Sequence, residues 1–170
     1  MMNRVAIHPG STHCVFRSGA GRFALPADAV REVLPCPALV AVPHSDPVLV
    51  GVCHLRSEFV PVLRPNELAL EGERHPPTEQ QLIVIDQKGG PWGLLVDQVA
   101  GLMSLELSAA ADDEAGEVQD TSALVGWATY ESEIVRVLDA QRLHAQALET
   151  LTKSWSRRAG RAQGTSLVSV

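Results

Sequence analysis

The sequence predicts a mainly β fold of short strands with few helices, arranged as paired small barrels or a sandwich. Only 4% of the residues are aromatic, so the core must be built from Val, Leu, Ile and Ala, and this β-branched composition favours sheets. Scattered Gly and Pro residues divide the chain into short apolar runs. The 170 residues are enough for a single domain with a sizeable core.

The first half of the chain is predicted to contain a flexible leader, a hairpin turning at Gly19–Gly21, a short helix and two further strands. Pro26 stands where the first turn of a helix tolerates proline, and Leu34–Pro37 would end that helix. In chain order these elements cover residues 1–11, 12–17, 22–25, 26–32, 39–42 and 48–62.

The second half is predicted to contain a helical turn, a polar loop, two hairpins and a last helix. Lys88–Pro91 and Glu131–Glu133 are the expected hairpin turns, and Asp139 is a plausible N-cap for a helix reaching about Thr152. In chain order the elements cover residues 65–70, 71–79, 81–86, 92–96, 99–107, 123–130, 134–138 and 139–152. The two halves share a plan, but no sequence repeat is evident.

Composition and charge exclude several classes of protein. A content of 45% hydrophobic and 20% charged residues is typical of a soluble globular chain, and a net charge of −6 argues against a general nucleic-acid binder. No apolar run approaches the roughly 18 residues that a membrane span needs, and the N-terminus lacks a signal pattern. We therefore expect a cytoplasmic protein. Cys14, Cys36 and Cys53 are irregularly spaced and predict no disulfide framework.

The most informative stretch is 48–62, an apolar strand pattern with Arg56 inside it. A charge at such a place is costly unless it is paired, so this arginine requires a structural or a functional reason. A guanidinium that binds buried carbonyls and one that contacts a partner fit the sequence equally well.

The pairs Gly51-Val52, Leu55-Arg56 and Pro61-Val62 resemble the signature of the CheW-like family, Gly-Val-x-Asn-Leu-Arg-Gly-x-x-x-Pro-Val, with the spacing intact. Three further motifs follow the family's order over residues 12–150, within a domain predicted at 12–152. They are Phe23–Val33, Gly93–Val99, and Leu124–Gly126 with Ile134–Asp139.

This resemblance implies two interlocked five-stranded SH3-like barrels with a C-terminal helix. It also implies a non-enzymatic adaptor that joins the regulatory domain of a CheA-type histidine kinase to the cytoplasmic tips of chemoreceptors, in arrays at the inner membrane. No cofactor, metal or catalytic residue is implied. The partner-binding positions would be Val30, Glu32, Gly51 and Arg56.

The chain departs from the family at three places. Ser57 replaces a glycine, His54 an asparagine, and Arg64 an aspartate. Glycine is needed at position 57 only if φ is positive there. The reversed charge of Arg64 would repel a partner adapted to the usual aspartate, which predicts a divergent or accessory member.

Other readings are weaker. Adjacent residues in a strand point to opposite faces of the sheet. The two side chains of His13-Cys14, or of Cys53-His54, therefore cannot bind the same metal ion. A small-barrel nucleic-acid binder would need a basic groove with stacked aromatics, and a thiol enzyme would need a base beside its cysteine. Asp97 is interpreted as a turn residue. The segment 153–170, with four basic residues, is predicted to be a disordered tail that could touch an acidic partner or lipid.

Overall fold

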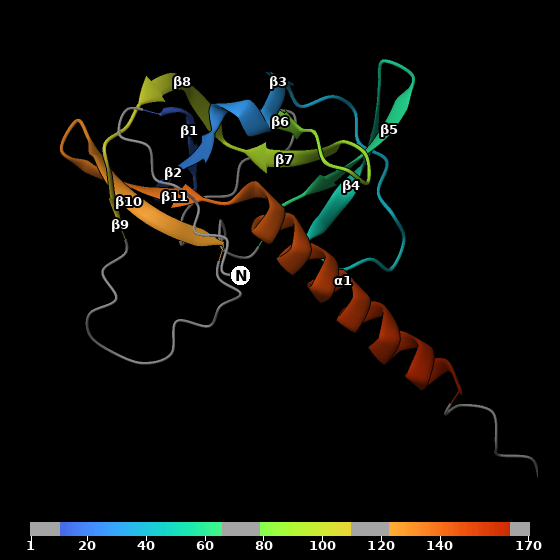
Figure 1. The fold of residues 1–170 in the computed structure, drawn as a ribbon. Helices are drawn as coiled ribbons and strands as arrows, with labels where there is room; N and C mark the ends of the chain where they lie inside the picture. Colours follow the sequence, from blue (N-terminus) through green and yellow to red (C-terminus); the bar gives the residue numbers. More distant parts are fainter. Residues whose placement is uncertain (1–10, 66–78, 110–122, 164–170) are drawn as a thin grey trace, which may run out of the picture.

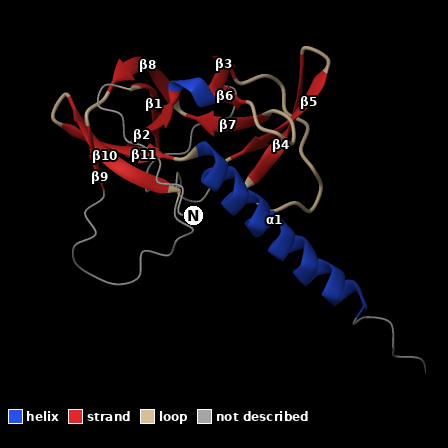
Figure 2. Ribbon diagram, in the orientation of Figure 1, coloured by secondary structure: helices blue, strands red, loops and turns tan. Residues whose placement is uncertain are grey.

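The computed structural model describes residues 11–65, 79–109 and 123–163. Their strands form two sheets, and one long helix follows them (Figures 1 and 2). We call the sheets A and B. Sheet A takes its strands from both ends of the chain and sheet B takes its strands from the middle, so the two are interlocked as the resemblance implies.

Sheet A has the strand order β8-β1-β2-β11-β10-β9. Its neighbours are antiparallel except β2 and β11, which run parallel with Arg136 opposite Phe23. The resemblance predicts five strands here, and the sixth is the short β9. The strands are β1 (Thr12–Ser18), β2 (Gly21–Pro26), β8 (Gln98–Ser104), β9 (Leu107–Ala109), β10 (Leu124–Tyr130) and β11 (Glu133–Leu138).

Sheet B has the order β3-β6-β7-β5-β4. Here β5 and β7 form the parallel pair, with Val62 opposite Gly93, and the other neighbours are antiparallel. The predicted hairpin of β6 and β7 is confirmed. The strands are β3 (Val30–Pro35), β4 (Leu49–Leu55), β5 (Glu58–Leu63), β6 (Gln81–Ile85) and β7 (Trp92–Val96).

Three apolar clusters form the core. One lies on sheet A and includes Val15 and Val135, and another lies on sheet B and includes Leu82 and Val60. The largest joins residues of both sheets, such as Phe16, to the first turns of the helix. Alternate residues of β1, β2, β6 and β7 thus enter different clusters, which explains why these strands are almost continuously apolar.

Two elements predicted for the first half are much shorter in the structure. The helix expected over 26–32 is a single 3-10 turn, Ala27–Ala29, and the chain enters β3 at Val30 because pairing with β6 satisfies its backbone. The strand expected over 39–42 is one isolated bridge between Val40 and Val52. The elements predicted over 1–11, 65–70 and 71–79 lie outside the described residues, apart from Ser11, Pro65 and Glu79, and so does 164–170 of the expected tail.

The C-terminal helix α1 (Ala140–Gln163) begins as predicted and ends later than predicted. The carboxylate of Asp139 accepts a hydrogen bond from the Arg142 N–H at 2.9 Å, which is the expected N-cap. The helix then continues past Thr152, so residues 153–163 are helical rather than disordered. No helix in the described part of the chain is long and apolar enough to cross a membrane.

Candidate functional site: a charged network at the rim of sheet B

Arg56 lies at the tip of a tight hairpin and not inside a long strand. Leu55 pairs with Glu58, so Arg56 and Ser57 form a two-residue turn between β4 and β5. Both have positive φ, 47° and 73°, as in a type I′ turn. The predicted single strand over 48–62 is therefore wrong. The positive φ at Ser57 also explains why the family prefers glycine at this position.

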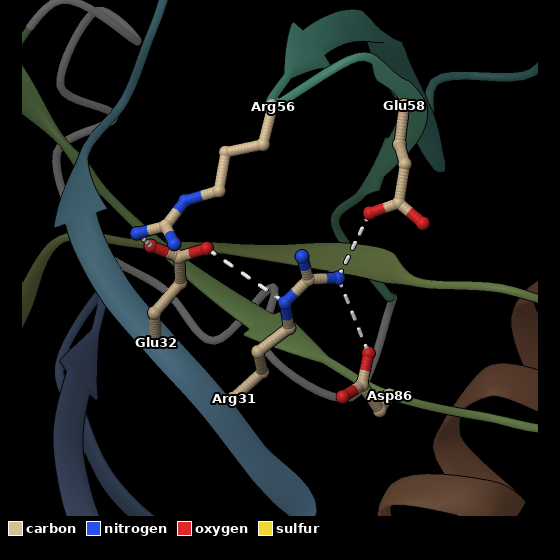
Figure 3. A network of polar contacts seen from close by, with 5 residues as sticks. All are labelled: Arg31, Glu32, Arg56, Glu58 and Asp86. Carbon is tan, nitrogen blue, oxygen red and sulfur yellow. Dashed lines mark hydrogen bonds and ion pairs between the residues drawn. The ribbon is translucent and has the colours of Figure 1, made fainter.

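The hairpin tip meets β3, although β3 and β4 are opposite edges of sheet B. Arg56 Nη2 donates to Glu32 Oε2 at 3.0 Å, and Arg31 Nη1 donates to Glu58 Oε2 at 2.9 Å (Figure 3). Such contacts require the sheet to curl until its edges approach each other. The two ion pairs therefore lie where the barrel of sheet B closes.

Five side chains form one network in Figure 3, with the Glu32 carboxylate between the two guanidinium groups. Arg31 Nη1 also lies 3.4 Å from Asp86 Oδ1, and its Nε lies 3.8 Å from Glu32 Oε1. The hydrogen bond with Glu58 is the main cause that raises the pKa of Arg31 above its ordinary value. We call Arg31, Glu32, Arg56, Glu58 and Asp86 the rim network.

The structure separates the two roles that the sequence left open for Arg56. Its side chain is 74% exposed, whereas that of Glu32 is 24% exposed. A guanidinium so open to water is not a buried structural charge, and it keeps donors available for a partner. Arg56 is therefore exposed and held by Glu32 on one side.

The other two predicted positions are less accessible. Val30 is half-buried and packs against the largest core cluster. Gly51 is buried, and a Cβ there would lie 2.8 Å from the Val40 carbonyl oxygen. Its glycine lets the bridge between Val40 and Val52 form, so we leave Gly51 out of the proposed contact surface.

Four residues at this rim were not predicted as site residues from the sequence, namely Arg31, Glu58, Phe59 and Asp86. Phe59 is 77% exposed and sits beside Glu58, with its ring 5.2 Å from that of His54 on the paired strand. A large exposed aromatic next to a charged network is typical of a protein-binding surface. The exposure of Phe59 could have been predicted from the alternation of side chains along a strand. Val60 and Val62 face the core, so Phe59 faces outward.

Arg64 and Asp97 belong to a second, internal network. Arg64 Nη2 donates to Gln80 Oε1 at 2.7 Å, and Gln80 Nε2 donates to Asp97 Oδ1 at 2.6 Å. The other Asp97 oxygen accepts the Gly19 N–H at 2.7 Å, which links sheet B to the first turn of sheet A. Asp97 is thus a structural tie, and Arg64 faces Gln80 instead of joining Arg56 at the rim.

The hairpin of β10 and β11 repeats the hairpin of β4 and β5. Each has the same burial pattern, a register shift after its first pair and a two-residue turn of positive φ. Leu49–Leu63 and Leu124–Leu138 align without a gap. Identical residues occupy the aligned pairs Leu49/Leu124, Val50/Val125, Gly51/Gly126, Ser57/Ser132, Glu58/Glu133, Val60/Val135, Val62/Val137 and Leu63/Leu138. The sequence therefore contains an internal repeat of 49–63 at 124–138 that was not predicted.

Metal-binding and thiol chemistry find little support. Within the described ranges, no group of three or more His, Cys, Asp or Glu residues could hold a metal ion. Burial is the main cause that raises the pKa of Cys14, Cys36 and Cys53. At neutral pH these side chains are therefore thiols and not the nucleophilic thiolates.

Comparison with known proteins places this fold. The model of the CheW-like domain matches residues 12–147. Among solved structures, the scaffolding protein TtCheW from Thermoanaerobacter tengcongensis superimposes with a TM-score of 0.64. That match has 16% sequence identity and covers 82% of this chain and 91% of the other. No curated protein sequence matches. Since the family model spans most of the chain, the protein belongs to the CheW-like domain family.

Proposed function

We propose that the protein is a non-enzymatic chemosensory adaptor that couples chemoreceptors to a CheA-type histidine kinase. Membership of the CheW-like family and the likeness to a scaffolding protein support an adaptor role. The raised pKa values of the three thiols favour a binding role over a thiol enzyme. Through these partners the protein would act at receptor arrays.

The observation that carries the proposal is the open guanidinium of Arg56 on a braced hairpin. Glu32 and Arg31 fix one side of the rim network, and the two-residue turn fixes the backbone of Arg56. A partner therefore meets a preorganised cation beside the exposed ring of Phe59. Preorganisation lowers the entropy lost on binding, so this surface suits specific recognition of a protein.

The test measures binding of the kinase regulatory domain and of a chemoreceptor tip fragment to Arg56→Ala, Glu32→Ala and the double variant. Arg17 provides a matched control, because it is an exposed arginine on β1 of sheet A. We expect Arg56→Ala to weaken one partner about tenfold or more, as loss of a contact residue does. Glu32→Ala should weaken the same partner less, and the two effects should be non-additive because the side chains are bonded.

Arg17→Ala should change neither affinity. Unchanged binding of both partners to Arg56→Ala would refute the proposed surface, even if the adaptor role itself were shown by binding of the unmodified protein.

A further inference from the structure

The last turns of α1 lie beyond the contacts that hold the helix to the sheets. Leu143, Ala147 and Leu151 are buried, and Ser154 is the last buried residue of the helix. Every residue from Trp155 to Arg161 is exposed, and Figure 1 shows this part of α1 running away from both sheets. A helix that continues so far past its own packing leaves Trp155 and Arg158 open to contact by another molecule.

This segment concentrates positive charge. Residues 150–163 contain four basic residues and no acidic ones, whereas the remainder of the chain has ten basic and twenty acidic residues. Arg161 lies in the last turn, where a positive charge interacts favourably with the helix dipole. Lys153 forms an ion pair with Glu149 at 2.6 Å. Neither of these two stabilising roles applies to Arg157 and Arg158.

A short apolar stripe runs beside one of these cations, Arg158. Leu148 is 46% exposed and Trp155 is 49% exposed. Residues seven apart on a helix share a side, so both lie on one stripe, and Arg158, three residues after Trp155, lies along its border. Arg157, two residues after Trp155, lies on the opposite side of the helix. A short apolar stripe bordered by a cation is a pattern with which one helix binds another helix that carries an acidic flank.

Other occupants fit less well. Pairing with residues 150–163 of a second copy would bring four basic residues against four others and supply no carboxylate, which is repulsive. A bilayer or a nucleic acid is an extended anionic surface, and it would also meet the rest of the chain, whose net charge is −10 from twenty acidic and ten basic residues. A single acidic helix can contact α1 without approaching the negatively charged remainder of the chain.

We propose that residues 148–161 of α1 form a docking surface for an acidic amphipathic helix of another protein. Trp155 and Leu148 would supply the apolar contact, and Arg158 would pair with a carboxylate on the flank of the bound helix. This surface is separate from the rim network, so the inference does not depend on the proposed function.

The probe is a synthetic helical peptide of about three heptads, with Leu at a and d and Glu at e and g, whose glutamates oppose self-pairing. Its binding to the full chain is measured by fluorescence anisotropy at low and high salt. We expect Arg158→Glu and Trp155→Ala each to weaken binding several-fold. Arg157→Glu makes the same charge change on the opposite side of the helix, so it should weaken binding less than Arg158→Glu does. High salt should weaken binding to the unmodified protein.

Two controls separate docking from general charge effects. Arg17→Glu makes the same charge change as Arg158→Glu, but on the sheets, and should alter binding less than about twofold. A peptide with Lys in place of Glu should prefer the Arg158→Glu variant. The proposal would be overturned if Arg17→Glu weakened binding as much as the helix variants, or if Trp155→Ala had no effect. Tighter binding to anionic vesicles or to duplex DNA than to the peptide would also overturn it.

Discussion

The hairpins of β4–β5 and β10–β11 have the same backbone and opposite charges at their tips. Arg56-Ser57 forms one turn and Glu131-Ser132 forms the other, all four with positive φ. Arg56 reaches Glu32 on the far edge of sheet B, whereas Glu131 pairs with Arg22 on β2 of sheet A. The shared residues encode the hairpin, and the differing tip residues give each hairpin a different charge at its tip.

The positions shared by the two hairpins are those that packing demands. Val60 and Val135 are fully buried at equivalent places, and Gly51 and Gly126 both lie where a neighbouring carbonyl approaches the backbone. The fold depends on the shared residues of one repeated unit, and the proposed function depends on the residues that differ. This division of roles can be tested by substituting the shared residues and the tip residues in both hairpins.

The largest effect should come from adding a methyl group at the shared glycines. A Cβ at Gly51 would lie 2.8 Å from the Val40 oxygen, and one at Gly126 would lie 3.1 Å from the Ser108 oxygen. We expect Gly51→Ala to destabilise the protein by about 2–3 kcal/mol and Gly126→Ala by about 1 kcal/mol. Urea denaturation gives both values. A larger loss for Gly126→Ala would contradict the packing argument.

The shared serines should show a smaller effect of the opposite sign. Ser57 and Ser132 have φ of 73° and 66°, a region that glycine adopts without strain. We expect Ser57→Gly and Ser132→Gly each to stabilise the fold by about 0.5 kcal/mol, because relieved strain exceeds the added chain entropy. The same denaturation series checks this. If only one serine responded, the two turns would not be equivalent.

The smallest effect concerns the helix that links the two sheets. α1 follows β11 of sheet A, yet its His144 ring lies 5.1 Å from Trp92 of sheet B. Burial lowers the pKa of His144 below its ordinary value of 6.5. The unfolded chain therefore binds more protons near and below that pH, so stability should fall as the pH drops through 6.5.

His144→Phe keeps an aromatic ring and removes the titration. Thermal unfolding of both proteins between about pH 8 and pH 5 measures the difference. The variant should lose less stability than the unmodified protein over this range. An identical fall in both would show that other groups cause the pH dependence.

Much of the fold could be predicted because it follows local patterns. The apolar runs of β6 and β7, the turn at Glu131-Ser132 and the Asp139 cap each have a signal within a few residues. The turn at Arg56-Ser57 was missed although Arg56–Glu58 interrupts the apolar pattern in the same way as Glu131–Glu133 does. Comparing it with Glu131-Ser132 would have revealed it, since Ser and Glu recur in the same places.

The rim network could not be predicted, because it depends on how sheet B curls. Nothing near Arg56 in the sequence indicates that β3 will lie beside it, and Glu32 was expected on a helix. Residues 153–163 were also misjudged, because Gly160 and the serines suggest disorder while helix packing through Leu151 and Ser154 extends the helix. Both errors concern contacts that tertiary structure supplies.

The most direct test of the central claim exchanges the tip charges one hairpin at a time. Calorimetry with the kinase regulatory domain and the receptor tip fragment would compare Arg56→Glu with Glu131→Arg. We predict that Arg56→Glu weakens one partner about tenfold or more while unfolding changes by less than about 0.5 kcal/mol, and that Glu131→Arg changes the same affinity less than about twofold. Equal losses from both variants, or an unstable Arg56→Glu protein that still binds, would contradict the claim.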